Sequence, residues 1–329
     1  MLEHGGRLRR AAQHYGIPLA DWLDLSTGIN PQAYPVPTVP VDAWHRLPED
    51  DDGLEAAAAT YYGSAALLPV AGSQPAIQAL PAVLPGARVS LLAPSYAEHA
   101  HAWRKRAPHF FDADLDTAEA AVDASDIVVL VQPNNPTGAL FSRERLLDWH
   151  SRLARRGGWL VVDEAFIDTT PEASLVPLTG ADGLVVLRSL GKFFGLAGAR
   201  VGFVFAPAAV RAQLAELLGP WTLSGPARHV ARAALMDRSW QAQARQQLAT
   251  GGVRLATLLQ QSGLGIPSGP SLFKWIAHPQ ASALHDALAQ RGILTRLFAR
   301  PSSLRFGLPP DEPGWQRLEQ ALKAYAHPA

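Results

Sequence analysis

A single lysine, Lys192, lies in an otherwise apolar and glycine-rich stretch, residues 189–200. A lysine buried without a partner loses much of its hydration energy, so its pKa shifts or it takes a covalent role. Only four of the 29 lysines and arginines are lysines, so arginine is the usual base of this chain. The setting indicates amine chemistry that a guanidinium cannot perform. A solvated surface loop is the alternative interpretation.

Three further motifs follow apolar runs and carry groups that can bind ligands. The amides of Asn134 and Asn135 can donate to a ligand oxygen, although the prolines and glycine around them are also typical of a turn. Asp163 ends an apolar run, where a carboxylate needs a cation or a donor, unless it caps a helix. Gly72 and Ser73 precede a helical pattern and can bind a phosphate through backbone N–H groups or merely begin the helix.

Short apolar runs alternate with helical patterns and predict the elements that carry these motifs. The predicted strands cover residues 89–93, 127–131, 159–162, 184–187 and 201–205. Continuous apolar runs are typical of parallel strands covered on both faces. We therefore expect an α/β fold with a mostly parallel sheet between helices, whose ligands bind beyond the carboxyl ends of the strands.

The rest of the chain predicts a second, smaller α+β domain. A long helical pattern begins near residue 225 and runs towards residue 263. After it, predicted strands at 272–277, 293–298 and 303–306 alternate with predicted helices near 280–291 and 313–326. We expect an N-terminal arm at 1–45 that contributes to the small domain, a large domain at 46–225 and a small domain at 226–329.

The composition excludes several classes of protein. With 48% hydrophobic and 18% charged residues the chain is globular rather than disordered. Basic and acidic residues balance at 29 each, which does not favour nucleic acid or an anionic membrane as a partner. Because the chain has no cysteine, it has no disulfide or thiolate metal site, and we expect no metal. It lacks a signal-peptide pattern and an apolar run near the roughly 20 residues that span a bilayer, so we expect a cytoplasmic protein.

Four motifs in order carry a family resemblance over nearly the whole chain. They are Asn-Asn-Pro-Thr-Gly at 134–138, Asp-Glu-Ala-Phe at 163–166, Ser-x-x-Lys at 189–192 and Arg200. The chain thereby resembles pyridoxal-phosphate enzymes with an aspartate-aminotransferase-like large domain. The most similar branch groups histidinol-phosphate aminotransferase with L-threonine-O-3-phosphate decarboxylase.

Two features of the sequence favour the decarboxylases of this branch. The opening His4-Gly5-Gly6, together with residues 25–31, is similar to theirs. Phe166 stands where aminotransferases normally have a tyrosine that touches the 3-hydroxyl of the cofactor.

The resemblance implies a role in binding pyridoxal 5'-phosphate for each motif. Lys192 would form a Schiff base with it, and Asp163 would pair with its pyridinium nitrogen. Asn135 would donate to its 3-hydroxyl, and Tyr96 would stack on its ring. Its phosphate would meet Ser189, Arg200 and the backbone of Gly72 and Ser73.

The resemblance also implies the groups that hold the substrate. Arg305 resembles the arginine that binds the substrate carboxylate, although a surface arginine at a sheet edge is the alternative. His4 and Arg296 are candidates for the substrate phosphate, and Gly28 and Asn30 for orienting the substrate. The chain departs from its relatives at Gly191, where several have a hydroxyl residue, and at Leu47, where many have a tyrosine that reaches the neighbouring subunit.

The expected reaction is decarboxylation of O-phospho-L-threonine to (R)-1-aminopropan-2-yl phosphate in cobalamin biosynthesis, by a homodimer that binds neither nucleic acid nor membrane. An aminotransferase acting on histidinol phosphate or a related amino acid is the second hypothesis. It would use the same cofactor residues but require a keto acid. A non-catalytic regulator that binds the same cofactor is the third, and it would need an added DNA-binding domain, for which we expect no room before the opening motif.

Overall fold

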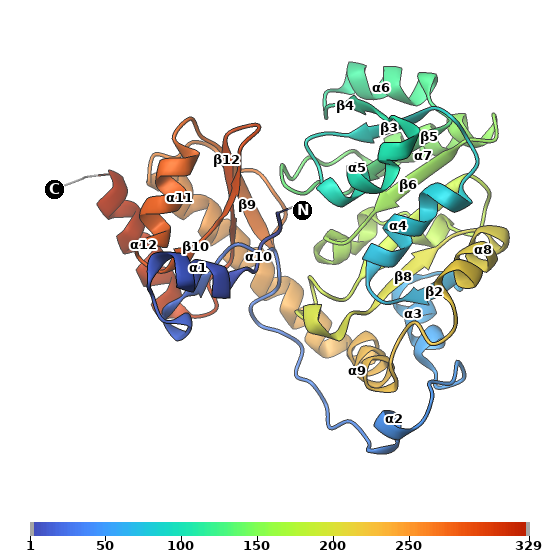
Figure 1. The fold of residues 1–329 in the computed structure, drawn as a ribbon, viewed down its shortest axis with the longest axis horizontal. Coiled ribbons are helices and arrows are strands. Elements are labelled where there is room, and N and C mark those ends of the chain that lie inside the picture. Colours follow the sequence, from blue (N-terminus) through green and yellow to red (C-terminus); the bar gives the residue numbers. More distant parts are fainter. Residues whose placement is uncertain (1–2, 327–329) are drawn as a thin grey trace. The chain divides into compact units, whose positions relative to one another are not determined.

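The computed structural model describes residues 3–326, and the chain groups into two compact units (Figure 1). The larger unit contains residues 33–135 and 139–243. The smaller unit combines the N-terminal part up to residue 32, the short segment 136–138 and the C-terminal part from residue 244. The small unit therefore draws on both ends of the chain.

The division differs from the predicted boundaries at 45/46 and 225/226. Residues from 33 onward belong to the larger unit because the Tyr34 backbone N–H donates to the Phe194 carbonyl (2.9 Å), and the Tyr34 ring packs edge-on against Trp240. Helix α9 (Gly225–Met236) belongs there because Arg228 on it forms an ion pair with Asp52. Contacts that are distant in sequence therefore decide the boundary.

A sheet of seven strands organises the larger unit. In spatial order the strands are β2 (Leu67–Val70), β8 (Gly202–Phe205), β7 (Leu184–Ser189), β6 (Trp159–Asp163), β5 (Ile127–Val131), β3 (Val89–Leu92) and β4 (His109–Phe111). Only β8 runs antiparallel to its neighbours in this sheet. The predicted mostly parallel sheet is confirmed, and its central strands β5 and β6 are almost wholly buried.

The larger unit also contains eight helices. They are α2 (Asp42–His45), α3 (Leu54–Tyr62), α4 (Ser73–Val83), α5 (Ala97–Trp103), α6 (Leu115–Ala124), α7 (Arg143–Ala154), α8 (Ala208–Leu218) and α9. One face forms a buried core in which Ile77 of α4, Trp103 of α5 and Leu214 of α8 pack with apolar side chains of the strands. Ser142 caps the start of α7, because its hydroxyl accepts the Arg145 N–H (3.3 Å) and satisfies one of the helix's unpaired donors.

The smaller unit is α+β, which confirms the prediction. Its strands are β1 (Leu23–Asp24), β9 (Phe273–Ala277), β10 (Ile293–Leu294), β11 (Arg296–Phe298) and β12 (Ser303–Gly307), and its helices are α1 (Leu8–Tyr15), α11 (Ala281–Ala289) and α12 (Glu312–Ala326). Strands β11, β12 and β9 form an antiparallel sheet, while β1 pairs with β10 in parallel. The long helix α10 (Arg238–Gln261) begins in the larger unit and continues into the smaller one. Among residues 3–326, no helix combines the length and the apolarity that crossing a membrane requires.

Candidate active site

The predicted cofactor residues all lie in the larger unit, near the carboxyl ends of the parallel strands of its sheet. Asn135, Asp163 and Lys192 follow or end β5, β6 and β7, which run parallel to one another. Tyr96 follows β3 in the same way, and Gly72 follows β2. The carboxyl ends of parallel strands lie on the same side of a sheet, and open α/β sheets bind their ligands there. Chain topology thus collects motifs that are far apart in the sequence.

Lys192 lies in the turn that follows β7 and is half-buried. Its Nζ atom lies 5.7 Å from the centre of the Phe166 ring, in the position of a cation–π contact. The turn is closed by the Gly195 N–H, which donates to the Lys192 carbonyl (3.1 Å). Gly191 before it is tightly placed, because an added Cβ would lie 3.3 Å from the Cα of Ala197. The lysine is therefore held on a short turn against an aromatic ring.

Asp163 ends β6 and is only 2% exposed. Its Oδ2 lies 3.0 Å from Nε2 of the buried His99 on α5, and its Oδ1 accepts the Ala165 N–H (3.1 Å). A buried carboxylate needs such donors. His99 was not predicted as a site residue, and the available signal was its place three residues after Tyr96, at the start of a helix. The histidine fixes the direction in which the carboxylate points.

Tyr96 is half-buried beside the same carboxylate. Burial, and then the negative charges of Asp163 and Glu98, raise the pKa of its phenol to about 12, with Arg200 acting in the opposite direction. The phenol therefore keeps its proton at neutral pH and donates to Oε1 of Gln74 (3.2 Å).

The two asparagines of the Asn-Asn-Pro motif have different surroundings. Asn134 is buried, and its side-chain amide accepts from the Ser95 hydroxyl (2.7 Å) and donates to the Pro94 carbonyl (2.8 Å). It therefore fastens the loop that carries Tyr96 to the loop after β5. Asn135 is half-buried at the start of the next turn. Asn134 therefore has the structural role that the turn interpretation expects. Donation to a ligand oxygen stays a prediction for Asn135.

Gly72, Ser73 and Arg200 form a cradle at the start of α4. Gly72 has a φ of +74°, and an added Cβ there would lie 2.6 Å from a guanidinium nitrogen of Arg200. An added Cβ at Gly202 would lie 2.9 Å from the backbone nitrogen of Ser73. Arg200 itself has a φ of +54°, a strained value for a residue other than glycine. Close-packed glycines, the first N–H groups of a helix and a guanidinium form an arrangement that suits a phosphate group.

The donor set therefore fits pyridoxal phosphate. The larger unit supplies a primary amine, a buried carboxylate for a pyridinium nitrogen, an aromatic ring and a phosphate cradle. Ser189 lies half-buried at the end of β7, where its hydroxyl accepts the Gly191 N–H (3.2 Å). None of these groups needs a metal ion to perform its role.

The predicted substrate residues all lie in the smaller unit. Arg296 on β11 and Arg305 on β12 stand directly opposite each other across the antiparallel pair, so both side chains lie on one face of the sheet. Arg305 is only 6% exposed, donates to the Ser26 carbonyl (2.8 Å) and lies over the Phe273 ring (5.1 Å).

Both arginines keep their charges in unfavourable surroundings. Burial and the nearby Arg296 lower the pKa of Arg305 to about 10, and the charge of Asp24 acts in the opposite direction. Burial also lowers the pKa of Arg296, and the charge of Arg7 lowers it further, with Glu3 opposing. Like charges placed opposite each other in a sheet are destabilising, so this pair suits a ligand with anionic groups.

Ser26 connects the opening motif to these arginines. Its hydroxyl accepts a hydrogen bond from the Gly6 N–H (2.7 Å) and donates one to Asp24 (2.6 Å). Its backbone carbonyl accepts the hydrogen bond from the Arg305 guanidinium. Gly5 must be glycine because an added Cβ would lie 2.2 Å from the Ser26 carbonyl oxygen. This packing fixes the segment that carries His4, although Ser26 was not predicted as a site residue.

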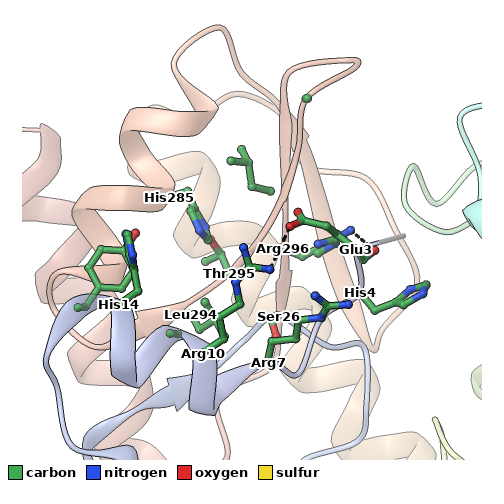
Figure 2. A pocket seen from close by; sticks show the side chains of 15 residues that line it. Glu3, His4, Arg7, Arg10, His14, Ser26, His285, Leu294, Thr295 and Arg296 are labelled. Carbon is green, nitrogen blue, oxygen red and sulfur yellow. Dashed lines mark hydrogen bonds and ion pairs between the residues drawn. The ribbon is translucent and has the colours of Figure 1, made fainter. Parts of the chain in front are cut away.

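Gly28 and Asn30 are buried in the loop after β1. The Asn30 side chain accepts the Gln32 N–H (2.9 Å), which is a turn-forming contact. Its role towards a substrate stays a prediction. His4 and Arg296 by contrast line one cavity of about 340 Å³ in this unit, together with Ser26 (Figure 2).

Comparison with known proteins finds similar sequences over nearly the whole chain. A family model described as aminotransferase class I and II matches residues 44–321. The chain is 55% identical to a threonine-phosphate decarboxylase of Pseudomonas aeruginosa, over 100% of this chain and 99% of the relative. It is 42% identical to a threonine-phosphate decarboxylase of a Sinorhizobium species, over 97% of both chains.

Solved structures show the same fold. The histidinol-phosphate aminotransferase of Sinorhizobium meliloti, solved in complex with pyridoxal-5'-phosphate, matches with a TM-score of 0.83 at 21% identity. The match covers 99% of this chain and 95% of that one. The prediction of an aspartate-aminotransferase-like fold is confirmed.

Proposed function

We propose that this chain, which belongs to the aminotransferase class I and II family, uses pyridoxal phosphate to decarboxylate O-phospho-L-threonine to (R)-1-aminopropan-2-yl phosphate in cobalamin biosynthesis. The two relatives that match over nearly their full length, both threonine-phosphate decarboxylases, support the choice of reaction. The observation that carries the substrate class is the pair of opposed arginines, Arg296 and Arg305. One small substrate with a carboxylate and a phosphate offers an anion to each.

The residues of the larger unit have the chemistry to hold the cofactor. When bound, pyridoxal phosphate supplies an electron sink for the bond that breaks at Cα of the substrate. Lys192 would hold it covalently through its side-chain amine. Asp163 would pair with the ring nitrogen and favour its protonated form, while His99 holds the carboxylate in position. Arg200 and the Gly72–Ser73 backbone hold its phosphate.

The residues of the smaller unit select which bond breaks. Arg305 binds the carboxylate through a forked, charge-assisted contact, and its bond to Ser26 restricts the orientation of the guanidinium. Arg296 and His4 bind the phosphate at the other end of the substrate. Fixing both ends sets the torsion about Cα, so binding energy away from the reacting carbon directs the reaction. As CO₂ leaves, a proton must return to Cα, and we assign this donation to the Lys192 amine.

The proposal includes a homodimer in the cytoplasm. In the larger unit Val41, Trp44 and Leu47 of the segment around α2 are each about two-thirds exposed, and Trp221 is 59% exposed. Large apolar side chains gathered on a surface are typical of protein interfaces. A second copy of the chain is the occupant we propose, although Leu47 lacks the hydroxyl that many relatives carry there.

A paired assay with purified protein and pyridoxal phosphate tests the proposed reaction. One arm supplies O-phospho-L-threonine without a keto acid and follows CO₂. The other supplies histidinol phosphate with 2-oxoglutarate and follows glutamate. We expect CO₂ without glutamate, and none from a Lys192→Ala control. Glutamate without CO₂ would refute the decarboxylase and favour the aminotransferase.

A further inference from the structure

A glutamine side chain links two helices of the larger unit beside the candidate active site. Gln74 follows Ser73 of the phosphate cradle and lies in the first turn of α4, which packs against α5. Its Nε2 donates to Oε2 of Glu98 (2.7 Å), and its Oε1 accepts a hydrogen bond from the Tyr96 hydroxyl (3.2 Å). Tyr96 directly precedes α5, and Glu98 lies in the first turn of that helix. One amide therefore forms a bridge, Tyr96–Gln74–Glu98, between the starts of α4 and α5.

The charge of Glu98 decides which way the amide of this bridge points. An ionised carboxylate only accepts hydrogen bonds, so it faces the NH₂ group of the glutamine. The amide oxygen is then left to Tyr96, and the phenol must be the donor. Burial, and then the charges of Asp163 and Glu98, raise the pKa of this phenol to about 12 against the opposing charge of Arg200. At neutral pH the phenol therefore holds the proton that it donates.

Two partners restrict the orientation of the Tyr96 ring. Gln74 binds its hydroxyl, and the His99 ring stands edge-on to it with the ring centres 6.1 Å apart. His99 is itself held by Asp163, whose Oδ2 lies 3.0 Å from its Nε2. Hydrogen bonds to charged groups are stronger than those between neutral groups, so the contact with Glu98 keeps the Gln74 amide in place. The Tyr96 ring is thus ordered before any ligand binds.

We propose that Gln74, oriented by Glu98, is a positioning residue that fixes the plane of the Tyr96 ring for the ring of pyridoxal phosphate. The inference rests on the proposed function and on the predicted stacking of the cofactor on Tyr96. A side chain that is already ordered loses little freedom when a ligand binds, whereas ordering a mobile one costs binding free energy. The Gln74 side chain therefore strengthens cofactor binding through the Tyr96 hydroxyl.

Gln74→Leu tests this role, with Gln78→Leu as the matched control. Both changes replace a glutamine of α4 by leucine, but Gln78 lies one turn later and is exposed. Cofactor-free protein is titrated with pyridoxal phosphate, and the visible absorbance of the lysine-bound cofactor is followed. We expect the dissociation constant to rise roughly two- to ten-fold in Gln74→Leu, the cost of ordering one side chain, and to stay unchanged in Gln78→Leu. The visible circular dichroism of the bound cofactor should weaken only in Gln74→Leu, because the Tyr96 ring then lacks one fixed orientation.

A double-mutant cycle with Tyr96→Phe separates positioning from a structural defect. Tyr96→Phe keeps the aromatic ring and removes the hydroxyl that Gln74 binds. If Gln74 acts through that hydroxyl, Gln74→Leu should have no further effect on the dissociation constant in the Tyr96→Phe background. An unchanged dissociation constant in Gln74→Leu, or an equal rise with and without the hydroxyl, would overturn the role of Gln74.

Failure of the proposed function would look different. If the wild type bound pyridoxal phosphate but released no CO₂ from O-phospho-L-threonine, the reaction would be refuted, and the cycle would still decide the role of Gln74. If the wild type bound no pyridoxal phosphate, the free energy of unfolding of the cofactor-free protein in urea would decide the amide bridge. Losses in Gln74→Leu and Tyr96→Phe that are not additive would support the bridge, and additive losses would refute it.

Discussion

Replacing Arg188 by methionine removes the guanidinium from a buried cluster beside the candidate active site. Arg188 lies on β7, four residues before Lys192, and its Nη1 donates to Glu164 (2.9 Å), the residue after Asp163. Its Nη2 pairs with Asp168, and both carboxylates are fully buried. The cluster therefore ties the ends of β6 and β7 together. These are the two strands that present the carboxylate and the amine.

The size of the effect follows from burial. Removing one partner of a buried ion pair typically costs about 3–5 kcal/mol, because the remaining charge is left without compensation. An exposed pair contributes only about 0–1 kcal/mol. We therefore expect Arg188→Met to lose about 3–5 kcal/mol of the free energy of unfolding. Arg88→Met is the control, since Arg88 pairs with Asp126 but is 63% exposed, and it should lose less than about 1 kcal/mol.

Urea unfolding followed by tryptophan fluorescence measures the loss of unfolding free energy in both variants.

The stability lost in Arg188→Met should depend on pH in a defined direction. Burial raises the pKa of Glu164, with Arg188 opposing, so the folded protein holds its proton more tightly than the unfolded chain. The stability that this gives is present at low pH and is lost as the pH rises. Without Arg188 the pKa rises further, so the deficit of Arg188→Met should grow between pH 5 and pH 8.

A triple variant decides whether charge is the cause. Changing Glu164→Gln and Asp168→Asn in the Arg188→Met background removes the uncompensated charges and should recover most of the loss. A triple variant as unstable as the single one, or a deficit that shrinks as the pH rises, would refute the reasoning.

Three further predictions concern the active site. Lys192→Ala should abolish both turnover and the visible absorbance of the lysine-bound cofactor, as recorded by spectrophotometry. Asp163→Ala should lower kcat at least about a hundred-fold and Asn135→Ala roughly ten-fold, since only the first removes a charged partner of the ring; equal effects in steady-state assays would contradict this assignment. Arg305→Met should raise KM about a hundred-fold for substrates with an α-carboxylate. The Tm of this variant should not fall below that of the wild type. Burial and Arg296 lower the pKa of Arg305 to about 10, so the charged guanidinium is unfavourable for the stability of the folded protein.

Much of the larger unit could be predicted because its central strands are buried on both faces. The apolar runs at 127–131 and 184–187 have no polar interruption, and the chemically active residues follow directly after such runs. Two strands of the same sheet were not predicted. β2 contains Pro69, which argues against a strand and is tolerated here because β2 lies at the sheet edge. β4, at the other edge, has only three residues and is mostly exposed.

The residues that were missed act through partners distant in the chain. His99 reads as an ordinary helical histidine until β6 brings Asp163 to its Nε2, 64 residues later. Ser26 likewise reads as a turn serine, although Gly6 and Arg305 bind it from opposite ends of the chain. No local pattern encodes such pairs, because each side chain alone has a common structural role.

The opposed arginines show why register matters more than residue type. A sequence places one arginine in each of two short strands, but only the pairing of β11 with β12 sets Arg296 against Arg305 on one face. A shift by one residue would turn one side chain to the other face and separate the charges. The fold instead keeps two like charges together, one of them almost fully buried. Because that arrangement costs free energy in the protein alone, it supports our proposal that the two arginines bind an anionic substrate.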